Sequence, residues 1–259
     1  MSATLALKIV LVPALIALIT LAGRRWGQGF AGWLGSFPIV AGPVLLVVTL
    51  ENGNLFGAQA AQAALAGVTP SMVFYVVYTR LAPHASWPWV AFAGLAAWTL
   101  VAAALLHFAW PLWATVTVTA LALYVAPRLM PKPDAVQGRA AHPFELPARM
   151  FTGAAVTVLS SELGRLGGAS LSGFAALFPS IGLIVATFNH AQSSASAATA
   201  FLRGMTRGMW SVAAFCLVLS TMLGRGSLAM ALTVAVGAAL LTHAAFKPRS
   251  HALPMGRPG

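Results

Sequence analysis

Long apolar stretches, separated by short polar or proline- and glycine-containing segments, make up most of this chain of 259 residues. A helix needs about 20 consecutive apolar residues to cross a bilayer. The pattern predicts nine such spans, at residues 4–22, 29–50, 62–82, 87–107, 110–127, 149–164, 168–189, 203–223 and 227–246. The longest polar stretch, 128–149, is predicted to be a loop in which Asp134 and Glu145 are solvated. The expected fold class is all-α, a polytopic transmembrane helical bundle.

The composition excludes a soluble protein. Hydrophobic residues make up 59% of the chain and charged residues only 7%, with a mean hydropathy of +0.84, whereas soluble domains carry about 25% charged residues. The one cysteine, Cys216, lies in an apolar run, and no pair of histidines has the spacing of metal ligands. Four acidic residues without a nucleophile–base pair leave little chemistry. We therefore expect no enzyme, no metal site and no cofactor.

The formal net charge of +11 predicts an orientation in the membrane. Lys and Arg concentrate in the cytoplasmic loops of membrane proteins. If the N-terminus lies outside, only Lys8, Arg165 and Arg225 are on the outer side, and all other Lys and Arg are cytoplasmic. The predicted topology is therefore N-out and C-in. A nucleic-acid partner is not expected, because the basic residues form no cluster with aromatic residues on a polar face.

The chain contains an internal repeat. Residues 23–38 match residues 164–179 at an offset of 141, through the pairs Gly23/Gly164, Arg24/Arg165, Gly27/Gly168, Gly32/Gly173, Phe37/Phe178 and Pro38/Pro179. Further matches join residues 65–69 to 202–206 and 101–106 to 236–241, where the offset is smaller. We therefore expect a duplication whose two copies differ in loop length.

Each copy accounts for four spans, and the span near 110–127 has no counterpart. The predicted arrangement is 4+1+4, in which one odd span turns the second copy upside down. The charges agree, because Arg24 is predicted inside and Arg165 outside. Inverted repeats are common in secondary transporters, which bind their substrates near the midplane where the repeats meet. The expected domains are a first four-span repeat (1–108), a linker span with a cytoplasmic loop (109–148), and a second four-span repeat with a short basic tail (149–259).

Two segments of the second copy resemble GlpM-type bacterial inner-membrane proteins. They are residues 178–185, which read Phe-Pro-Ser-Ile-Gly-Leu-Ile-Val, and residues 207–211, which read Arg-Gly-Met-Trp-Ser. That family has chains of about half this length, with a Phe-Pro element on one helix and a Gly-x-Trp-Ser start on another. The resemblance covers 149–246 well and 4–107 loosely, because residues 71–74 depart from the second motif. It implies a multi-pass protein of the bacterial inner membrane and a genetic link to exopolysaccharide production.

Prolines interrupt matching helices of the two copies. Pro38 and Pro43 lie in the predicted span 29–50, and Pro179, followed by Ser180, lies in its counterpart. A proline lacks a backbone donor and leaves a carbonyl unpaired, and in a membrane such groups need a partner or a cavity. Matching interruptions in two repeats favour a substrate-binding site. The alternative is a tolerated kink with close glycine packing.

Two acidic residues at the ends of predicted spans are further candidates for substrate binding. Glu51, followed by Asn52, ends the second span, and Glu162 lies near the end of the sixth, three residues before Arg165. Ionisable residues in a span are costly and therefore mark candidate functional sites. Glu162 and Arg165 can also pair on one helix face, which would be a structural role.

The remaining candidates lie near the cytoplasmic ends of the later spans. Asn189 and His190 end the seventh span, where His190 is a candidate proton relay. Arg203 and Arg207 are four residues apart on one face of the eighth span. Together they could attract an anionic solute or a lipid head group. Anchoring at the cytoplasmic interface explains them equally well.

Histidines and tryptophans near span ends are expected to lie at the membrane–water interface. His107 and His243 end matched helices. Six tryptophans also lie near the ends of predicted spans: Trp26, Trp33, Trp87, Trp89, Trp110 and Trp113.

Three functions follow from these observations. The first is a transporter or channel for a small solute, with an anion as one candidate, acting at the interface of the repeats. The second is a translocator of a lipid or lipid-linked sugar, or an accessory protein of exopolysaccharide export. The third is a membrane scaffold without transport activity. The expected partners are the lipid bilayer and a small-molecule solute or lipid head group, and homo-oligomerisation stays open.

Overall fold

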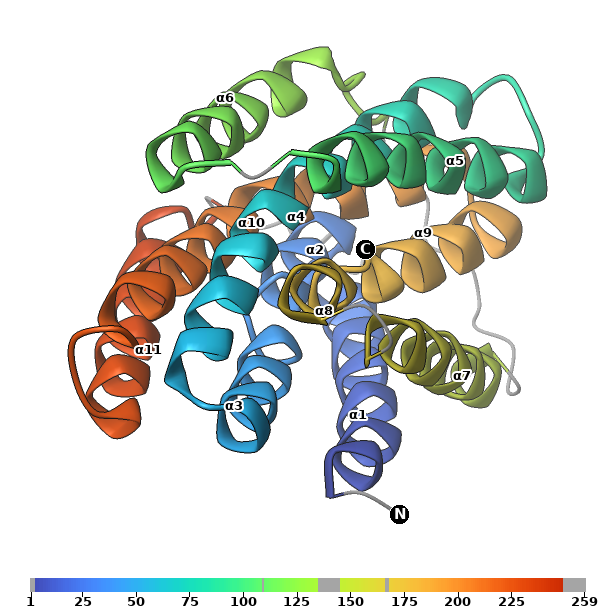
Figure 1. Ribbon diagram of the computed structural model, residues 1–259. Helices are drawn as coiled ribbons and strands as arrows, with labels where there is room; N and C mark the ends of the chain where they lie inside the picture. Colours follow the sequence, from blue (N-terminus) through green and yellow to red (C-terminus); the bar gives the residue numbers. More distant parts are fainter. Residues whose placement is uncertain (1–2, 109, 135–144, 166–167, 249–259) are drawn as a thin grey trace.

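The computed structural model describes residues 3–108, 110–134, 145–165 and 168–248, and the side chains of these residues except 3–10, 157 and 160–165. Within these residues eleven α-helices and no strand form the fold (Figure 1). In chain order they are α1 (Ala3–Trp26), α2 (Gln28–Gly35), α3 (Ala41–Asn52), α4 (Asn54–Leu81), α5 (Trp87–Leu106), α6 (Leu112–Leu129), α7 (Glu145–Arg165), α8 (Gly168–Ala176), α9 (Ser180–Gln192), α10 (Ala195–Met222) and α11 (Leu228–Ala245).

Six helical stretches in the described part of the chain are long and apolar enough to cross a membrane. They are α4, α5, α6, α8 together with α9, α10 and α11. Both α4 and α10 begin well before the spans predicted for them, because Gln and Ser lower the hydropathy of segments in which Ala still favours a helix. The prediction of an all-α fold is confirmed, and the six apolar stretches indicate a multi-pass membrane protein.

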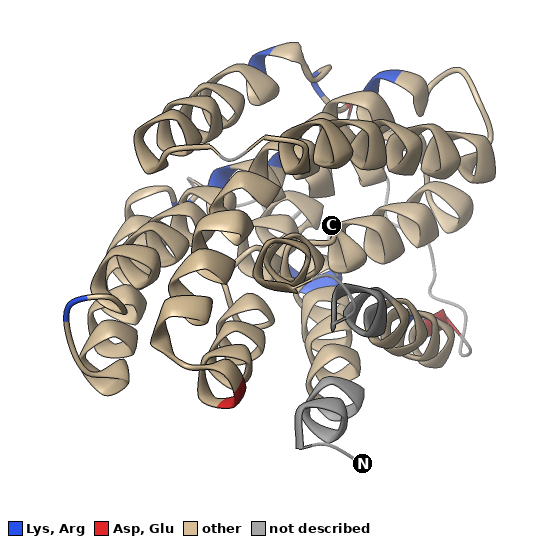
Figure 2. Cartoon of the chain, viewed as in Figure 1, with Lys and Arg blue, Asp and Glu red and all other residues tan. Residues whose placement is uncertain are grey.

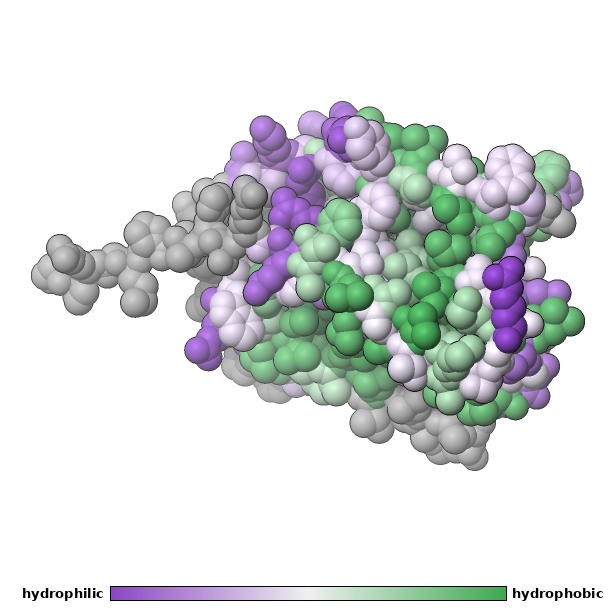
Figure 3. Space-filling view, turned by 90° about the vertical axis from the view of Figure 1, so that its left-hand side faces the viewer, coloured by the Kyte–Doolittle hydropathy of each residue, from purple (hydrophilic) through white to green (hydrophobic). Residues whose placement is uncertain are grey.

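The surface supports the same conclusion. Figure 3 shows an apolar area in the middle of one face of the molecule, with hydrophilic residues gathered toward its edges. Large apolar side chains such as Phe92 on α5, Trp113 on α6 and Leu241 on α11 are exposed, as expected of helices that face lipid. Most of each ribbon in Figure 2 carries no charge, and α1, α4 and α6 have Arg in their last turns.

The two predicted spans that contain the matched prolines are broken rather than kinked. The span expected at 29–50 is divided into α2 and α3, and the span expected at 168–189 into α8 and α9. At the first break the Ile39 N–H donates to the Phe37 carbonyl at 2.7 Å, and at the second the Ser180 N–H donates to the Phe178 carbonyl at 2.7 Å. These tight turns around the prolines replace the helical pattern of hydrogen bonds.

Two of the helix pairs that correspond under the expected duplication begin at one offset. Both α4 and α10 have 28 residues and begin at Asn54 and Ala195, and α5 and α11 begin at Trp87 and Leu228. These starts differ by 141, the offset of the Gly and Phe-Pro matches. The smaller offsets of the alanine-rich matches, 65–69 with 202–206 and 101–106 with 236–241, are not those of the helix starts, and these sequence matches stay a prediction.

Each broken helix packs against the long helix of the other half of the chain, with α2 against α10 and α8 against α4. Glycine makes both contacts close. A Cβ on Gly32 would lie 1.9 Å from the Phe201 carbonyl oxygen, and one on Gly173 would lie 2.2 Å from that of Ala60. Small residues let the backbones of membrane helices approach in this way. The core therefore forms where α2, α4, α8 and α10 cross, and α5, α6 and α11 lie outside it (Figure 1).

Two residues expected at the membrane interface are instead inside the fold. Trp33 is 8% exposed and stacks on the ring of His243, with the ring centroids 4.2 Å apart. The Trp33 indole N–H donates to the backbone carbonyl of His243 at 3.2 Å. Both side chains are buried where they pack against each other, and the Phe37 ring also contacts His243. In contrast, Trp26, Trp89 and Trp113 are exposed as expected.

Candidate functional site

Both helix breaks line one cavity of about 70 Å³, which is large enough for a small ion or a few water molecules. The first break contributes residues 35–38 and the start of α3, and the second contributes residues 176–182. Ser71 and Tyr75 of α4 lie on its wall, together with methionines of α10. The matched prolines are therefore brought together at one place in the interior.

The first turns of α3 and α9 leave backbone donors unpaired beside this cavity. Val40 and Pro179 occupy the N-cap positions of these helices and provide no side-chain cap. The N–H groups of Val40 and Ala41, and those of Ile181 and Gly182, have no hydrogen-bond partner among the described residues. By comparison, α10 and α11 are capped by serine side chains. Apolar and proline caps thus leave four donors free in the protein interior.

Most carbonyl groups at the breaks are already paired. The carbonyl of Pro38 accepts from Gly42, and that of Pro179 accepts from Leu183. The Ser71 hydroxyl donates to the Leu177 carbonyl at 3.0 Å. The cavity therefore offers more free donors than free acceptors from its backbone.

Two hydroxyl groups add to these donors. Tyr75 is 1% exposed and Ser180 is 6% exposed, and neither hydroxyl has a hydrogen-bond partner in the described part of the chain. A Cβ built on Gly182 would lie 3.4 Å from the Tyr75 hydroxyl oxygen, so the tyrosine reaches the first turn of α9. No Asp, Glu, Lys, Arg or His lines the cavity among the described residues. The wall is uncharged and polar only through hydroxyl and backbone groups.

The phenylalanines that precede the prolines are covered by the last helices of the opposite copies. The Phe37 ring contacts the His243 ring of α11, with centroids 5.1 Å apart. The Phe178 ring contacts Trp98 of α5, with centroids 5.3 Å apart. The Trp98 indole N–H points to Ser71 at 3.4 Å. The side chains around the breaks are therefore held by α5 and α11.

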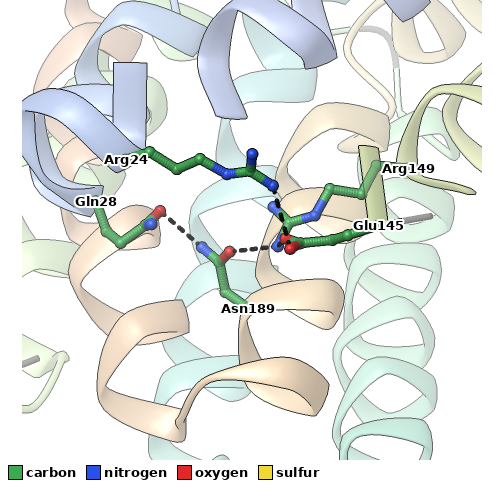
Figure 4. A network of polar contacts seen from close by, with 5 residues as sticks. All are labelled: Arg24, Gln28, Glu145, Arg149 and Asn189. Carbon is green, nitrogen blue, oxygen red and sulfur yellow. Dashed lines mark hydrogen bonds and ion pairs between the residues drawn. The ribbon is translucent and has the colours of Figure 1, made fainter. Parts of the chain in front are cut away.

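A buried polar network lies farther along α9 (Figure 4). The guanidinium of Arg149, which is 4% exposed, donates to the Asn189 side-chain oxygen at 3.0 Å, and Asn189 donates to Gln28 at 2.9 Å. Glu145 pairs with Arg149 at 2.5 Å and with Arg24 at 3.2 Å. The expectation that Glu145 is a solvated loop residue is therefore wrong, because Glu145 begins α7 and its side chain is only 11% exposed.

Several predicted site residues lie away from the cavity. Pro43 is half-buried in the first turn of α3, and Glu51 and Asn52 are exposed at the other end of that helix. Glu162 and Arg165 belong to the last turns of α7, but their predicted pairing lies outside the described side chains. Of the ten predicted residues whose side chains the structure describes, Pro38, Pro179 and Ser180 line the cavity.

The histidine and arginine candidates also have local roles. Nδ1 of His190 lies 3.4 Å from the Tyr78 hydroxyl. Arg203 donates to the carbonyls of Met130 at 2.7 Å and Pro127 at 3.0 Å, so it closes the end of α6. Through Nη1 its guanidinium is tied to the end of α6, whereas Arg207 is exposed; attraction of a solute by the pair stays a prediction.

No direct signal in the sequence marks Tyr75, Gln28 or Arg149 as interior polar residues. Tyr75 lies in an ordinary apolar run, and its partner Gly182 is more than 100 positions away. One indirect signal exists, because the residue at the same place in the second copy is Cys216. A tyrosine in the first half of the chain, where the second half has a cysteine, could have indicated Tyr75 as a residue with a separate role.

The chain matches no family model, and no curated protein and no solved structure gives a significant match. Among the described residues no group of His, Cys, Asp or Glu could hold a metal ion.

Proposed function

We propose that the protein is a membrane transporter or channel for a small solute, which binds in the cavity between the two broken helices. The observation that carries this proposal is the shared cavity itself: two helix breaks, 141 residues apart in the sequence, line one uncharged polar space. Discontinuous helices that meet in the interior are the usual construction of substrate sites in transporters with repeats. Unpaired backbone groups are tolerated at membrane depth only where they line such a cavity.

The order of the helices supports an inverted repeat. Helices α1 to α5 correspond in order and similar length to α7 to α11, and α6 stands between the two sets. Counting each broken pair as one crossing makes four crossings per set and one between them. This is the proposed 4+1+4 arrangement, with the N-terminus outside. The distribution of Lys and Arg favours the same orientation.

The resemblance to GlpM-type proteins makes the bacterial inner membrane the proposed location. A lipid or lipid-linked-sugar translocator and a scaffold rank behind a small-solute pathway. The lipid alternative relied on Arg203 and Arg207 as a pair at a lateral opening, but Arg203 is engaged with the end of α6. The volume of the cavity also suits a small solute better than a sugar.

Flux through reconstituted vesicles tests the proposal. The panel would contain salts of small anions, sodium and potassium, and the neutral solutes urea and glycerol, with swelling followed by light scattering. We expect at least one solute to enter faster than into protein-free vesicles. Ala41→Phe, which fills the cavity from a residue that is 5% exposed, should return the rate to that of protein-free vesicles.

Leu241→Phe is the matched control, because Leu241 is 76% exposed on the outer face of α11. It should leave the rate unchanged. If folded, monodisperse protein carries no solute of the panel, the proposal is wrong. If both variants transport like the parent protein, the pathway does not run through this cavity.

A further inference from the structure

We propose that the cavity binds a small monovalent anion, held by the first-turn N–H groups of α3 and α9 and by the hydroxyls of Tyr75 and Ser180. The inferred class is a halide, nitrate or one-carbon carboxylate. Binding stands on the geometry of the cavity, whereas the idea that this anion is also the transported solute rests on the proposed function.

Two helix N-termini point into the same space. Each carries a partial positive charge from its unpaired N–H groups and the helix dipole, and such ends bind anions. Here the free donors are those of Val40 and Ala41 on one side and of Ile181 and Gly182 on the other. A cation in this position would face two positive ends, and most nearby carbonyls are occupied.

The side chains give an independent indication of a ligand. The residues Tyr75 and Ser180 are 1% and 6% exposed, and their hydroxyls have no partner in the described residues. The enclosed hydroxyls of Thr20 and Thr69 also lack a partner, but only Tyr75 and Ser180 of these four residues can offer theirs to a ligand in the cavity. Both residues line the cavity. The Tyr75 hydroxyl reaches the first turn of α9, as its closeness to Gly182 shows. A bound anion would accept from both hydroxyls and from the free N–H groups.

The described cavity wall carries no charged side chain. It should therefore favour a ligand with a single charge over one with two. A doubly charged anion would lose its hydration without an opposite charge to replace it, which is very unfavourable. A monovalent anion loses less and can be held by neutral donors. The volume of about 70 Å³ favours a small anion.

A positive cluster lies along the same face of α9. Asn189 is seven residues, or two helical turns, from Gly182, which places it about 10 Å away along the axis. Its hydrogen-bond partner Arg149, together with Arg24 and against one Glu145, gives the network an excess of positive charge. Such a field raises the local concentration of anions.

The test compares the parent protein with Tyr75→Phe and Tyr78→Phe. Both tyrosines lie on α4 and are at most 1% exposed, but the Tyr78 hydroxyl contacts His190 rather than the cavity. Vesicles loaded with potassium chloride, nitrate, formate, sulfate or gluconate receive a potassium ionophore, and anion efflux is recorded. We expect efflux of the first three only. Tyr75→Phe should slow it about tenfold, the effect of one lost hydrogen bond to a charged group, and Tyr78→Phe should leave it unchanged.

A binding measurement separates this inference from the proposed function. In detergent, chloride or nitrate should raise the melting temperature of the parent protein relative to gluconate, and Tyr75→Phe should remove the difference. A melting temperature indifferent to the anion would overturn the inference. Flux of cations or neutral solutes alone would also overturn it and leave the proposed function intact. Anion-dependent stabilisation without any flux would uphold the binding site and contradict transport.

Discussion

At the scale of single residues, the buried guanidinium of Arg149 is the most demanding feature. It lies among Glu145, Asn189 and the Phe188 ring, and its Nε has no hydrogen-bond partner among the described residues. A charge in the interior is tolerated only when it is paired. The network therefore joins α1, α2, α7 and α9 near the start of the second copy.

Removing this guanidinium should destabilise the protein strongly. Arg149→Met leaves Glu145 and Asn189 without their partner, and we expect a loss of about 3 kcal/mol. Thermal unfolding in detergent would measure it as a lower melting temperature. Arg207→Met, at an exposed arginine, should change stability by less than about 0.5 kcal/mol. Equal melting temperatures for the two variants would show that the network contributes nothing special.

The sequence predicted some site residues and missed others for a physical reason. Pro38 and Pro179 were found because proline has a backbone consequence that needs no partner. The ion pair of Arg24 with Glu145 joins residues 121 positions apart, and neither its burial nor the unpaired Tyr75 hydroxyl has a local pattern. Such contacts depend on which helices cross, and this is decided by the whole fold.

At the scale of the helices, the glycine crossings control how closely the copies meet. Gly32 faces the backbone of α10 and Gly173 faces that of α4. In each case an added methyl group would overlap a carbonyl oxygen, so a helix must move. Flexible side chains cannot relieve these contacts.

Alanine substitutions test these crossings. Gly32→Ala and Gly173→Ala should each lower stability by about 1–3 kcal/mol or more through overpacking. Gly237→Ala on α11 is the control, because nothing lies within 4 Å of its added Cβ, and it should stabilise by about 0.5–1 kcal/mol. The readout is the melting temperature of each purified variant. Similar stability in all three variants would mean that α2 and α8 do not pack as described.

Helix boundaries could be predicted where proline or glycine interrupts an apolar segment. They were harder to predict where the amino-acid composition changes little along the chain. The breaks at Pro38 and Pro179 and the glycine turns with positive φ at Gly27 and Gly168 coincide with sequence matches. The starts of α4 and α10 were missed, because a segment rich in Ala and Gln is helical without being strongly apolar. The correspondence of later helices was obscured for the same reason.

At the scale of the molecule, the proposed topology can be tested with four single cysteines. With Cys216, which is fully buried, replaced by Ala, cysteines are placed at Asn54, His84, Ser193 and Arg225, all exposed beside helix ends. An impermeant thiol reagent on intact cells should label positions 54 and 225 but not 84 and 193. Permeabilised cells, in which all four should react, provide the control. Labelling of 54 and 193 from one side would exclude inverted copies.

The overall fold was predictable to the extent that hydrophobicity determines it. An all-helical membrane protein follows from composition alone, whereas the repeat is proposed from a few matching glycines and prolines. The packing of the two halves against each other could not be predicted, because the sequence of an apolar helix does not indicate which neighbouring helix it contacts. Packing of α2 on α10 and of α8 on α4 is visible only in the folded molecule.

This packing means that neither half contains a complete site. A half-length chain with the same helices would have to form a homodimer to complete such a cavity. Each residue would then occur twice, once on each side of the cavity. Joining the copies in one chain removes that restriction. At the proposed offset of 141, Tyr75 corresponds to Cys216 and Ser180 corresponds to Ile39. The two hydroxyl groups thus come from different halves of the chain and from positions that do not match, and a ligand in the proposed site would meet an asymmetric environment that a symmetric pair of identical chains could not provide.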